Sequence, residues 1–253
     1  MRKVLATIGT GPMGPILDIA LPTFRMYAER HGYDLVVGTG DADGRAASWA
    51  KVPLLQRLLA TYDAALWIDS DILVLDPSAD LAEVVPTEDF QGVVEQVVSA
   101  NERAINTGVW FLRSGDRSRA FLDAVWNHDA EGEPGMWENL QVLDLLGYTT
   151  VRPYWPTRQT DWLRGTALID PTWNAIGVGA KGRFRHYSAM SNEQRRRLMK
   201  RDLLVTDSPD NSRPVRRAER IARDIEHAIY ERTRRQQDGR MYFARRIAGE
   251  AEP

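Results

Sequence analysis

Short apolar runs alternate with helical patterns along the first seventy residues of the chain. The runs at 4–8, 33–37 and 64–68 are each followed by Gly or Asp, and each predicts a buried strand. Between them, apolar residues recur at helical spacing over 15–31 and 49–62, which predicts two helices. This order of elements is typical of an α/β domain with a mostly parallel central sheet flanked by helices.

The rest of the chain alternates less regularly. Two further strands and two further helices are predicted at 91–98, 105–112, 117–128 and 137–146. Residues 149–187 are rich in Pro, Trp and Gly, and they predict irregular loops with short strands. A last apolar stripe at helical spacing predicts a helix over 213–235. We therefore expect one α/β body followed by a helical extension.

Composition and charge narrow the class of protein. A chain of 253 residues with a net charge of −2 fits one soluble domain and offers no bulk positive charge for binding nucleic acid. The charge is divided unevenly, with −7 over residues 1–190 and +5 over residues 191–253. The absence of Cys excludes disulfides and thiolate chemistry, and no apolar run predicts a signal peptide or a membrane span. We expect a cytoplasmic protein, and the excess of Arg over Lys favours a bacterial origin.

A glycine-rich turn follows the first predicted strand. Residues 9–14 read G-x-G-x-x-G between a strand and a helix, which is the pattern of a dinucleotide-binding loop. However, Pro12 and Pro15 lack the N–H groups that such a loop offers to phosphate, and no acid ends the second strand. An ordinary Gly/Pro turn is favoured, and an NAD(P)-binding oxidoreductase is the weaker alternative.

Two acids interrupt a strongly apolar segment directly after the third predicted strand. Asp69 and Asp71 lie on either side of Ser70, and strand geometry would direct both to one side. Two like charges near a core repel and are costly to desolvate, and a divalent cation such as Mg²⁺ or Mn²⁺ relieves both penalties. The carboxyl ends of parallel strands are also where open α/β sheets bind ligands. The pattern favours a metal site, with a solvated turn as the alternative.

Four ordered segments resemble glycosyltransferase family 34, the retaining α-galactosyl- and α-xylosyltransferases. They are the helix-to-strand segment at 27–35, the W-x-K-x-P-L-L helix at 49–55, the D-x-D at 69–71 and the N-T-G-x-x-x-L-R strand at 106–113. The resemblance implies a GT-A fold for residues 1–190, with 191–253 as a basic helical extension packed on it. It also implies a metal-dependent glycosyltransferase that moves a hexosyl or pentosyl unit from a UDP- or GDP-linked sugar to an acceptor hydroxyl.

The resemblance further implies roles for individual residues. In such enzymes the D-x-D holds Mn²⁺ or Mg²⁺ at the diphosphate of the donor and a late His completes the site, which assigns the metal to Asp69, Asp71 and His186. The implied catalytic group is Asp69, Asp71, Glu138 and Asn139. The implied contacts with the nucleotide or donor sugar are Thr7, Lys51, Asp69, Ser70, Asn106, Gly108, Glu138 and Asn139. No residue is placed as a nucleophile, so we expect same-face transfer with retention.

Each of these assignments has a simpler alternative. His186 is otherwise a partly buried histidine, Lys51 a solvated helix residue and Glu138 an acid favoured near a helix N-terminus. Asn106 is otherwise a turn or strand-entry residue. A nucleotidyltransferase that makes sugar nucleotides is the main alternative enzyme, and a non-catalytic binding module of the same fold is another. Expected partners are a nucleotide sugar and a small-molecule or glycan acceptor, with peripheral membrane contact or a homodimer through the C-terminal helix as alternatives.

Overall fold

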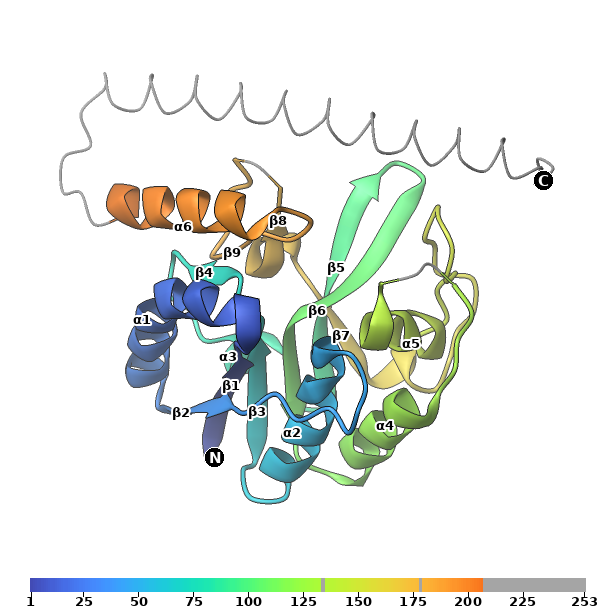
Figure 1. Ribbon diagram of the computed structural model, residues 1–253. Coiled ribbons are helices and arrows are strands. Elements are labelled where there is room, and N and C mark those ends of the chain that lie inside the picture. Colours follow the sequence, from blue (N-terminus) through green and yellow to red (C-terminus); the bar gives the residue numbers. More distant parts are fainter. Residues whose placement is uncertain (133–134, 178, 207–253) are drawn as a thin grey trace, which may run out of the picture.

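A computed structural model describes residues 1–132, 135–177 and 179–206 of the chain (Figure 1). Its larger sheet has six strands in the order β2-β1-β3-β6-β5-β7. The strands are β1 Lys3–Ile8, β2 Tyr33–Gly38, β3 Ala64–Ile68, β5 Gln91–Ser99, β6 Glu102–Arg113 and β7 Thr166–Ile169. Strand β1 is parallel to β2 and β3, and β5 is parallel to β7, whereas β6 is antiparallel to both of its neighbours. The predicted mostly parallel sheet is confirmed.

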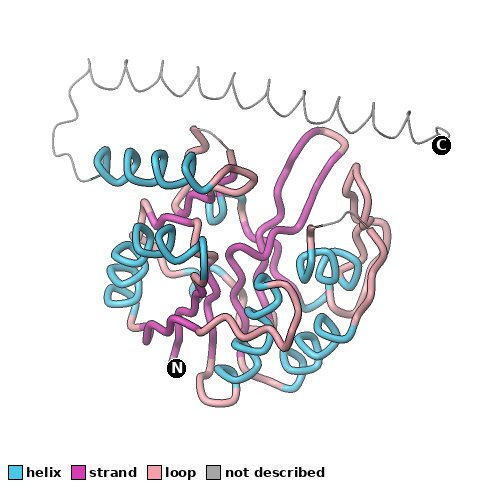
Figure 2. Tube along the Cα trace, viewed as in Figure 1, coloured by secondary structure: helices cyan, strands magenta, loops and turns pink. Residues whose placement is uncertain are grey.

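Helices cover both faces of this sheet. They are α1 Gly14–His31, α2 Lys51–Leu59, α3 Leu81–Val84, α4 Asp116–Asn127, α5 Trp137–Leu145 and α6 Asn192–Thr206. Helix α1 lies on one side of the sheet, and α2, α4 and α5 lie on the other (Figures 1 and 2). Alternate residues of β1 enter the two cores, Leu5 on the α1 side and Val4 and Ala6 on the α2 side. Because β1 and β3 are buried on both faces, they occur as nearly continuous apolar runs in the sequence.

A second, smaller sheet brings a distant part of the chain beside the third strand. It consists of β4 Ile72–Val74, β9 Phe184–His186 and β8 Ala175–Ile176, in that order. Strand β9 is antiparallel to β4, and its register pairs His186 with Ile72. The backbone N–H of Tyr187 also donates to the carbonyl of Asp71 at 2.9 Å. The short strands expected within 149–187 therefore serve to place β9 next to the D-x-D.

The turn after β1 is short and tightly packed. Residues Gly11–Met13 form a 3-10 turn that leads directly into α1. A Cβ at Gly9 would lie 2.6 Å from the Cβ of Leu17, so the loop lies too close to α1 for a side chain there. The predicted Gly/Pro turn is confirmed.

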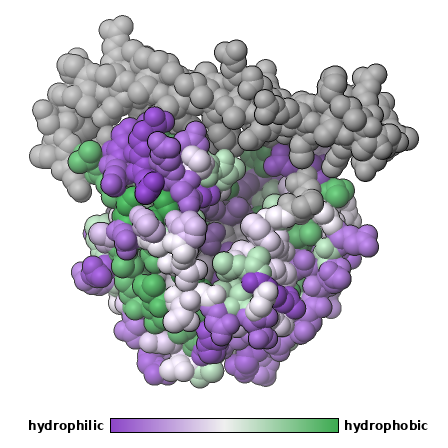
Figure 3. All heavy atoms as spheres, in the orientation of Figure 1, coloured by the Kyte–Doolittle hydropathy of each residue, from purple (hydrophilic) through white to green (hydrophobic). Residues whose placement is uncertain are grey.

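Helix α6 is attached to the small sheet and to α1, although the sequence pattern predicts no helix there. Its apolar residues Leu198 and Met199 are buried, Leu203 packs partly buried against the core, and Leu204 is exposed. Figure 3 shows most of its outer surface as strongly hydrophilic. The hydroxyl of Tyr187 donates to Asp202 of α6 at 2.6 Å, and the same carboxylate pairs with the buried Arg185. These contacts hold the described part of residues 191–253 against the body.

The rest of the predicted extension lies outside the described residues. This applies to the helix at 213–235 and to the homodimer expected through it, and the boundary at residue 190 stays a prediction. Within the described part of the chain, no helix combines the length and apolarity needed to cross a bilayer.

Candidate active site

A cleft of about 1420 Å³ opens at the carboxyl edge of β1 and β3. The small sheet, the start of α5 and the outer part of the β5–β6 hairpin contribute its other walls. Its polar residues include Lys51, Asp69, Asp71, Asn106, Glu138 and His186. The topology thus brings together side chains that lie up to 135 positions apart in the sequence, from Lys51 to His186.

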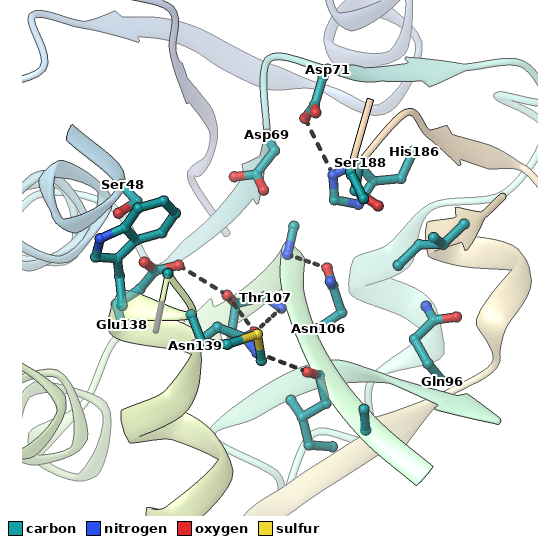
Figure 4. Close-up of a pocket in the computed structure, with 18 of the residues that line it drawn as sticks. Ser48, Asp69, Asp71, Gln96, Asn106, Thr107, Glu138, Asn139, His186 and Ser188 are labelled. Atoms are coloured by element: carbon teal, nitrogen blue, oxygen red, sulfur yellow. Dashed lines mark hydrogen bonds and ion pairs between the residues drawn. The ribbon is translucent and has the colours of Figure 1, made fainter. Parts of the chain in front are cut away.

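Asp71 of the D-x-D faces His186 in this cleft, and Asp69 lies close beside them (Figure 4). Asp69 directly follows β3 and its side chain is 27% exposed, whereas Asp71 is buried between β3 and β4. The Nε2 atom of His186 lies 3.2 Å from Oδ1 of Asp71. One potential ligand atom from each of the three side chains lies within 4.8 Å of the others. The predicted metal ligands are therefore neighbours in space.

Nitrogen-bearing side chains flank Asp71 on both sides. Its burial raises the pKa of the carboxyl, but His186 and Arg195 oppose burial and lower the pKa to about 2. The Nε atom of Arg195 lies 2.9 Å from Oδ2 of Asp71, opposite the oxygen that faces His186. Asp71 is therefore ionised at neutral pH, and the solvated turn considered for the D-x-D does not describe it.

Lys51 links the D-x-D to α5. It is buried at the start of α2, with its Nζ atom 2.8 Å from Oε1 of Glu138 and 3.1 Å from Oδ1 of Asp69. Burial lowers the pKa of Lys51, but Asp69 and Glu138 outweigh it and raise the pKa above its ordinary value. Burial raises the pKa of Glu138, and Lys51 opposes that rise. Lys51 is therefore not the solvated helix residue of its simpler alternative, whereas Glu138 does lie in the first turn of α5, as its own alternative describes.

The start of α5 is also joined to β6 by Asn139. Its Oδ1 accepts from the backbone N–H of Thr107 at 2.9 Å, and its Nδ2 donates to the carbonyl of Ile105 at 3.0 Å. The hydroxyl of Thr107 reaches both Asn139 and Glu138, at 3.0 and 3.3 Å. Asn139 therefore fixes α5 against the strand that carries Asn106, while its predicted contact with a donor sugar stays a prediction.

The structure does not bring every predicted residue to the cleft. Thr7 is completely buried within β1, and its side chain is not part of the cleft wall, where Ile8 and Thr10 lie instead. Ser70 and Gly108 do line the cleft. A Cβ at Gly108 would lie 2.8 Å from Cε1 of His186, so glycine leaves room for the imidazole.

Three residues of the site follow from no motif in the sequence. Trp67 donates its indole N–H to Oδ1 of Asp69 at 2.6 Å, and Arg195 pairs with Asp71. Asn174 is completely buried and contacts His186 through its side chain. Arg195 is the first of three consecutive arginines, and nothing in the local pattern distinguishes it from the other two.

The chemistry of the three clustered groups fits a divalent cation. Carboxylate oxygens and an imidazole nitrogen are ligands of Mn²⁺ and, for the oxygens above all, of Mg²⁺. A shared cation also explains why two acids stand together beside a buried histidine, because it would balance their charge. The arrangement therefore suits Asp69, Asp71 and His186 as protein ligands, with part of the coordination sphere left for a second molecule in the cleft.

Residues 15–92 match the sequence profile of the galactosyl transferase GMA12/MNN10 family, which is glycosyltransferase family 34. An alpha-1,2-galactosyltransferase of Schizosaccharomyces pombe is 26% identical over 152 residues, which cover 46% of this chain and 40% of that protein. The Saccharomyces cerevisiae protein named "Probable alpha-1,6-mannosyltransferase MNN10" is 22% identical over 144 residues, with coverages of 44% and 37%. The chain thus spans less than half the length of these relatives.

Several solved structures are similar over most of the chain. One of them is a glycosyltransferase involved in the glycosylation of the major capsid of PBCV-1, with a TM-score of 0.61 at 15% sequence identity. The similarity covers 79% of this chain and 100% of that one. The predicted GT-A fold and the resemblance to glycosyltransferase family 34 are both confirmed.

Proposed function

We propose that this protein is a metal-dependent glycosyltransferase. It moves a hexosyl or pentosyl unit from a UDP- or GDP-linked sugar to the hydroxyl of an acceptor, with retention of the anomeric configuration. The observation that carries the proposal is the group formed by Asp69, Asp71 and His186, whose potential ligand atoms lie within 4.8 Å of one another in the wall of the cleft. The family match and the two yeast relatives named as glycosyltransferases support the same activity.

The volume of the cleft supports two substrates. Small-molecule pockets commonly measure about 300–1,000 Å³, and this cleft, at about 1420 Å³, exceeds that range. Its wall is charged near β3 and the small sheet, where a diphosphate would lie beside the three ligands. Val97 and Val98 of the β5–β6 hairpin and Trp137 of α5 expose apolar surface on the other walls. A donor at the charged wall leaves the remaining volume for an acceptor.

The protein residues have separate tasks in this proposal. Asp69, Asp71 and His186 would hold Mn²⁺ or Mg²⁺. When bound, the cation would act as a Lewis acid and stabilise the nucleoside diphosphate that leaves as the glycosidic bond of the donor breaks. Lys51 holds Asp69 and Glu138 in place through its two ion pairs. Glu138 and Asn139 lie at the start of α5, on the side of the cleft where the donor sugar would extend.

Retention without a protein nucleophile requires attack from the face that the diphosphate leaves. A diphosphate oxygen would then accept the proton of the acceptor hydroxyl, and the protein would orient both substrates and exclude water. Product formed from a donor of known anomeric configuration would be examined by NMR. A product with the opposite configuration at the anomeric carbon would refute same-face transfer.

The activity is tested with the full chain and a panel of UDP- and GDP-sugars, each with and without Mn²⁺. We expect metal-dependent release of the nucleoside diphosphate, and Asp71→Asn should lower it by at least about tenfold because a ligand is lost. Asp116→Asn is a matched control, since Asp116 is fully exposed at the start of α4 and does not line the cleft. Activity that is unaffected by chelation of the metal, or retained in Asp71→Asn, would contradict the proposal. A cytoplasmic location stays a prediction.

A further inference from the structure

A chain of hydrogen bonds leads from the backbone of β6 to His186. The backbone N–H of Gly108 donates to Oδ1 of Asn106 at 2.9 Å, and Nδ2 of Asn174 donates to the same oxygen at 2.6 Å. The other end of the Asn174 amide, Oδ1, lies 2.9 Å from Nδ1 of His186. Asn174 ends the 3-10 turn Pro171–Asn174 and is completely buried. The same His186 ring presents Nε2 to Asp71.

The direction of every bond in this chain is fixed at its first member. A backbone N–H can only donate, so the atom of Asn106 that faces Gly108 must be its oxygen. An oxygen that accepts there requires a donor from Asn174, which turns the amide group of Asn174 with its NH₂ toward Asn106. The oxygen of Asn174 then faces His186, and Nδ1 of His186 must carry a hydrogen.

This hydrogen decides what Nε2 of His186 can do. With a hydrogen fixed on Nδ1, the ring has Nε2, the atom 3.2 Å from Oδ1 of Asp71, as the nitrogen that can bind a cation. Without a cation, the carboxylate opposite Nε2 favours a second hydrogen on that atom. Protein histidines that bind metals commonly donate their second ring N–H to a hydrogen-bond acceptor, which fixes the tautomer and the orientation of the ring. A buried amide oxygen serves as that acceptor here.

We propose that Asn106 and Asn174 are positioning residues that hold His186 in the Nδ1–H tautomer, with Nε2 directed at the cation shared with Asp69 and Asp71. The inference rests on the proposed metal site and specifies how one of its ligands is oriented. It also changes the role expected of Asn106, because its amide oxygen is already used by Gly108 and Asn174. Any contact between Asn106 and a sugar is left to its NH₂ group.

The hydrogen on Nδ1 is measured directly, without metal, by long-range ¹H–¹⁵N NMR of the imidazole rings. The sequence contains four histidines, so the His186 signals are assigned by comparison with His186→Gln. We expect Nδ1 of His186 to carry a hydrogen in the wild-type protein and a larger population of rings without that hydrogen in Asn174→Ala. Asn127→Ala is the control, because Asn127 is exposed and bonds within α4. A His186 ring in the wild-type protein that carries no hydrogen on Nδ1 would overturn the proposal.

The affinity for Mn²⁺, measured by calorimetry without any sugar nucleotide, provides the second readout. Loss of a partner that orients a ligand typically weakens metal binding by roughly 10–100-fold, and we expect this range for both Asn174→Ala and Asn106→Ala. Asn106→Asp keeps an oxygen for Gly108 and Asn174, so it should retain the Nδ1–H tautomer and bind Mn²⁺ no more than about threefold more weakly than wild type. A purely structural role would instead move the melting temperature and leave the tautomer unchanged.

The two readouts separate failure of this inference from failure of the proposed function. If the wild-type protein binds no Mn²⁺ while the tautomer shifts as expected in Asn174→Ala, the hydrogen-bond chain orients the ring but the metal site is wrong. If Mn²⁺ binds and neither alanine variant changes the tautomer or the affinity, the metal site stands and the positioning role is refuted. If Asn174→Ala does not fold, the two Asn106 variants decide between these outcomes.

Discussion

Replacement of Lys51 by methionine should destabilise the protein strongly, because it leaves two carboxylates together without their cation. Lys51 is 4% exposed and pairs with Glu138, which is also 4% exposed, and with the more accessible Asp69. Methionine retains much of the length of the lysine stem, and its apolar, flexible side chain packs well in a buried position. The change therefore removes the charge while it preserves most of the packing.

The distances allow an estimate of the effect on stability. At an effective dielectric constant of about 20, unit charges separated by the 2.8 Å between Lys51 and Glu138 attract each other by about 6 kcal/mol. Desolvation cancels much of this attraction in the intact pair, but removal of one partner from a buried pair usually costs about 3–5 kcal/mol. We expect the lower end, about 3 kcal/mol, because burial already raises the pKa of Glu138 and eases its protonation. For a chain of this size, that loss lowers the melting temperature by about 6–12 °C.

The assay is urea unfolding at pH 7 followed by circular dichroism, with thermal unfolding as a second measure. The double variant Lys51→Met/Glu138→Gln removes the unpaired carboxylate and should recover about half of the loss, because paired residues do not act additively. Lys200→Met is the matched control, since Lys200 is exposed on α6 and a surface change of this kind is expected within about 0.5 kcal/mol of wild type. A loss below about 1 kcal/mol in Lys51→Met, or no recovery in the double variant, would refute this account of the pair.

Three further predictions concern the sheet and the site. Asp80 accepts hydrogen bonds from Lys3 and Tyr33 at 2.5 and 2.6 Å. Burial raises the pKa of the Asp80 carboxyl, but these hydrogen bonds outweigh burial and lower the pKa below its ordinary value. Asp80→Asn should therefore lower the free energy of unfolding by about 3 kcal/mol at pH 7. That stabilisation is complete above about pH 4 and is lost as the pH falls further, so urea unfolding at a series of pH values should show wild type and variant converging in acid. Gly92→Ala would place a Cβ 2.4 Å from Cγ2 of Val85, and a loss of about 1–3 kcal/mol should be measurable by thermal unfolding. Gly108→Ala would push a methyl group against His186, so calorimetry should record roughly tenfold weaker Mn²⁺ binding, and an unchanged affinity would count against the placement of His186.

The elements that the sequence predicts well are those whose burial is visible in the pattern itself. The strands β1 and β3 are buried on both faces, and a strand in that position can tolerate few residues other than apolar ones. Helix α6 is not predicted, because most of its residues are polar and its burial is not visible in the sequence pattern. It contacts the body mainly through Leu198, Met199 and Leu203 and through the polar Asp202, and these few apolar positions among many charged ones produce no clear helical stripe.

The residues of the site also fall into two groups: some are found from a local sequence segment, and the environment of others is visible only in the fold. Asp69, Asp71 and His186 are found in the sequence because each stands in a recognisable segment of the family pattern. The burial of Lys51 is not visible there, because a lysine at the start of a helix is ordinarily solvated. Only the approach of α5 supplies the second carboxylate, Glu138, that makes the buried position tolerable.

The roles of Asn174 and Arg195 are the hardest parts of the site to predict from the sequence. Asn174 lies in the irregular stretch 149–187, and asparagine is common in turns for reasons unrelated to ligands. Its significance arises from a single backbone N–H on β6, which sets the direction of the Asn106 amide and thereby that of Asn174. No sequence pattern encodes the direction of an amide, because that depends on which donor lies across the fold. The inference about His186 therefore depends on the register of β6 and of the small sheet, because that register decides which side chains can form the hydrogen-bond chain.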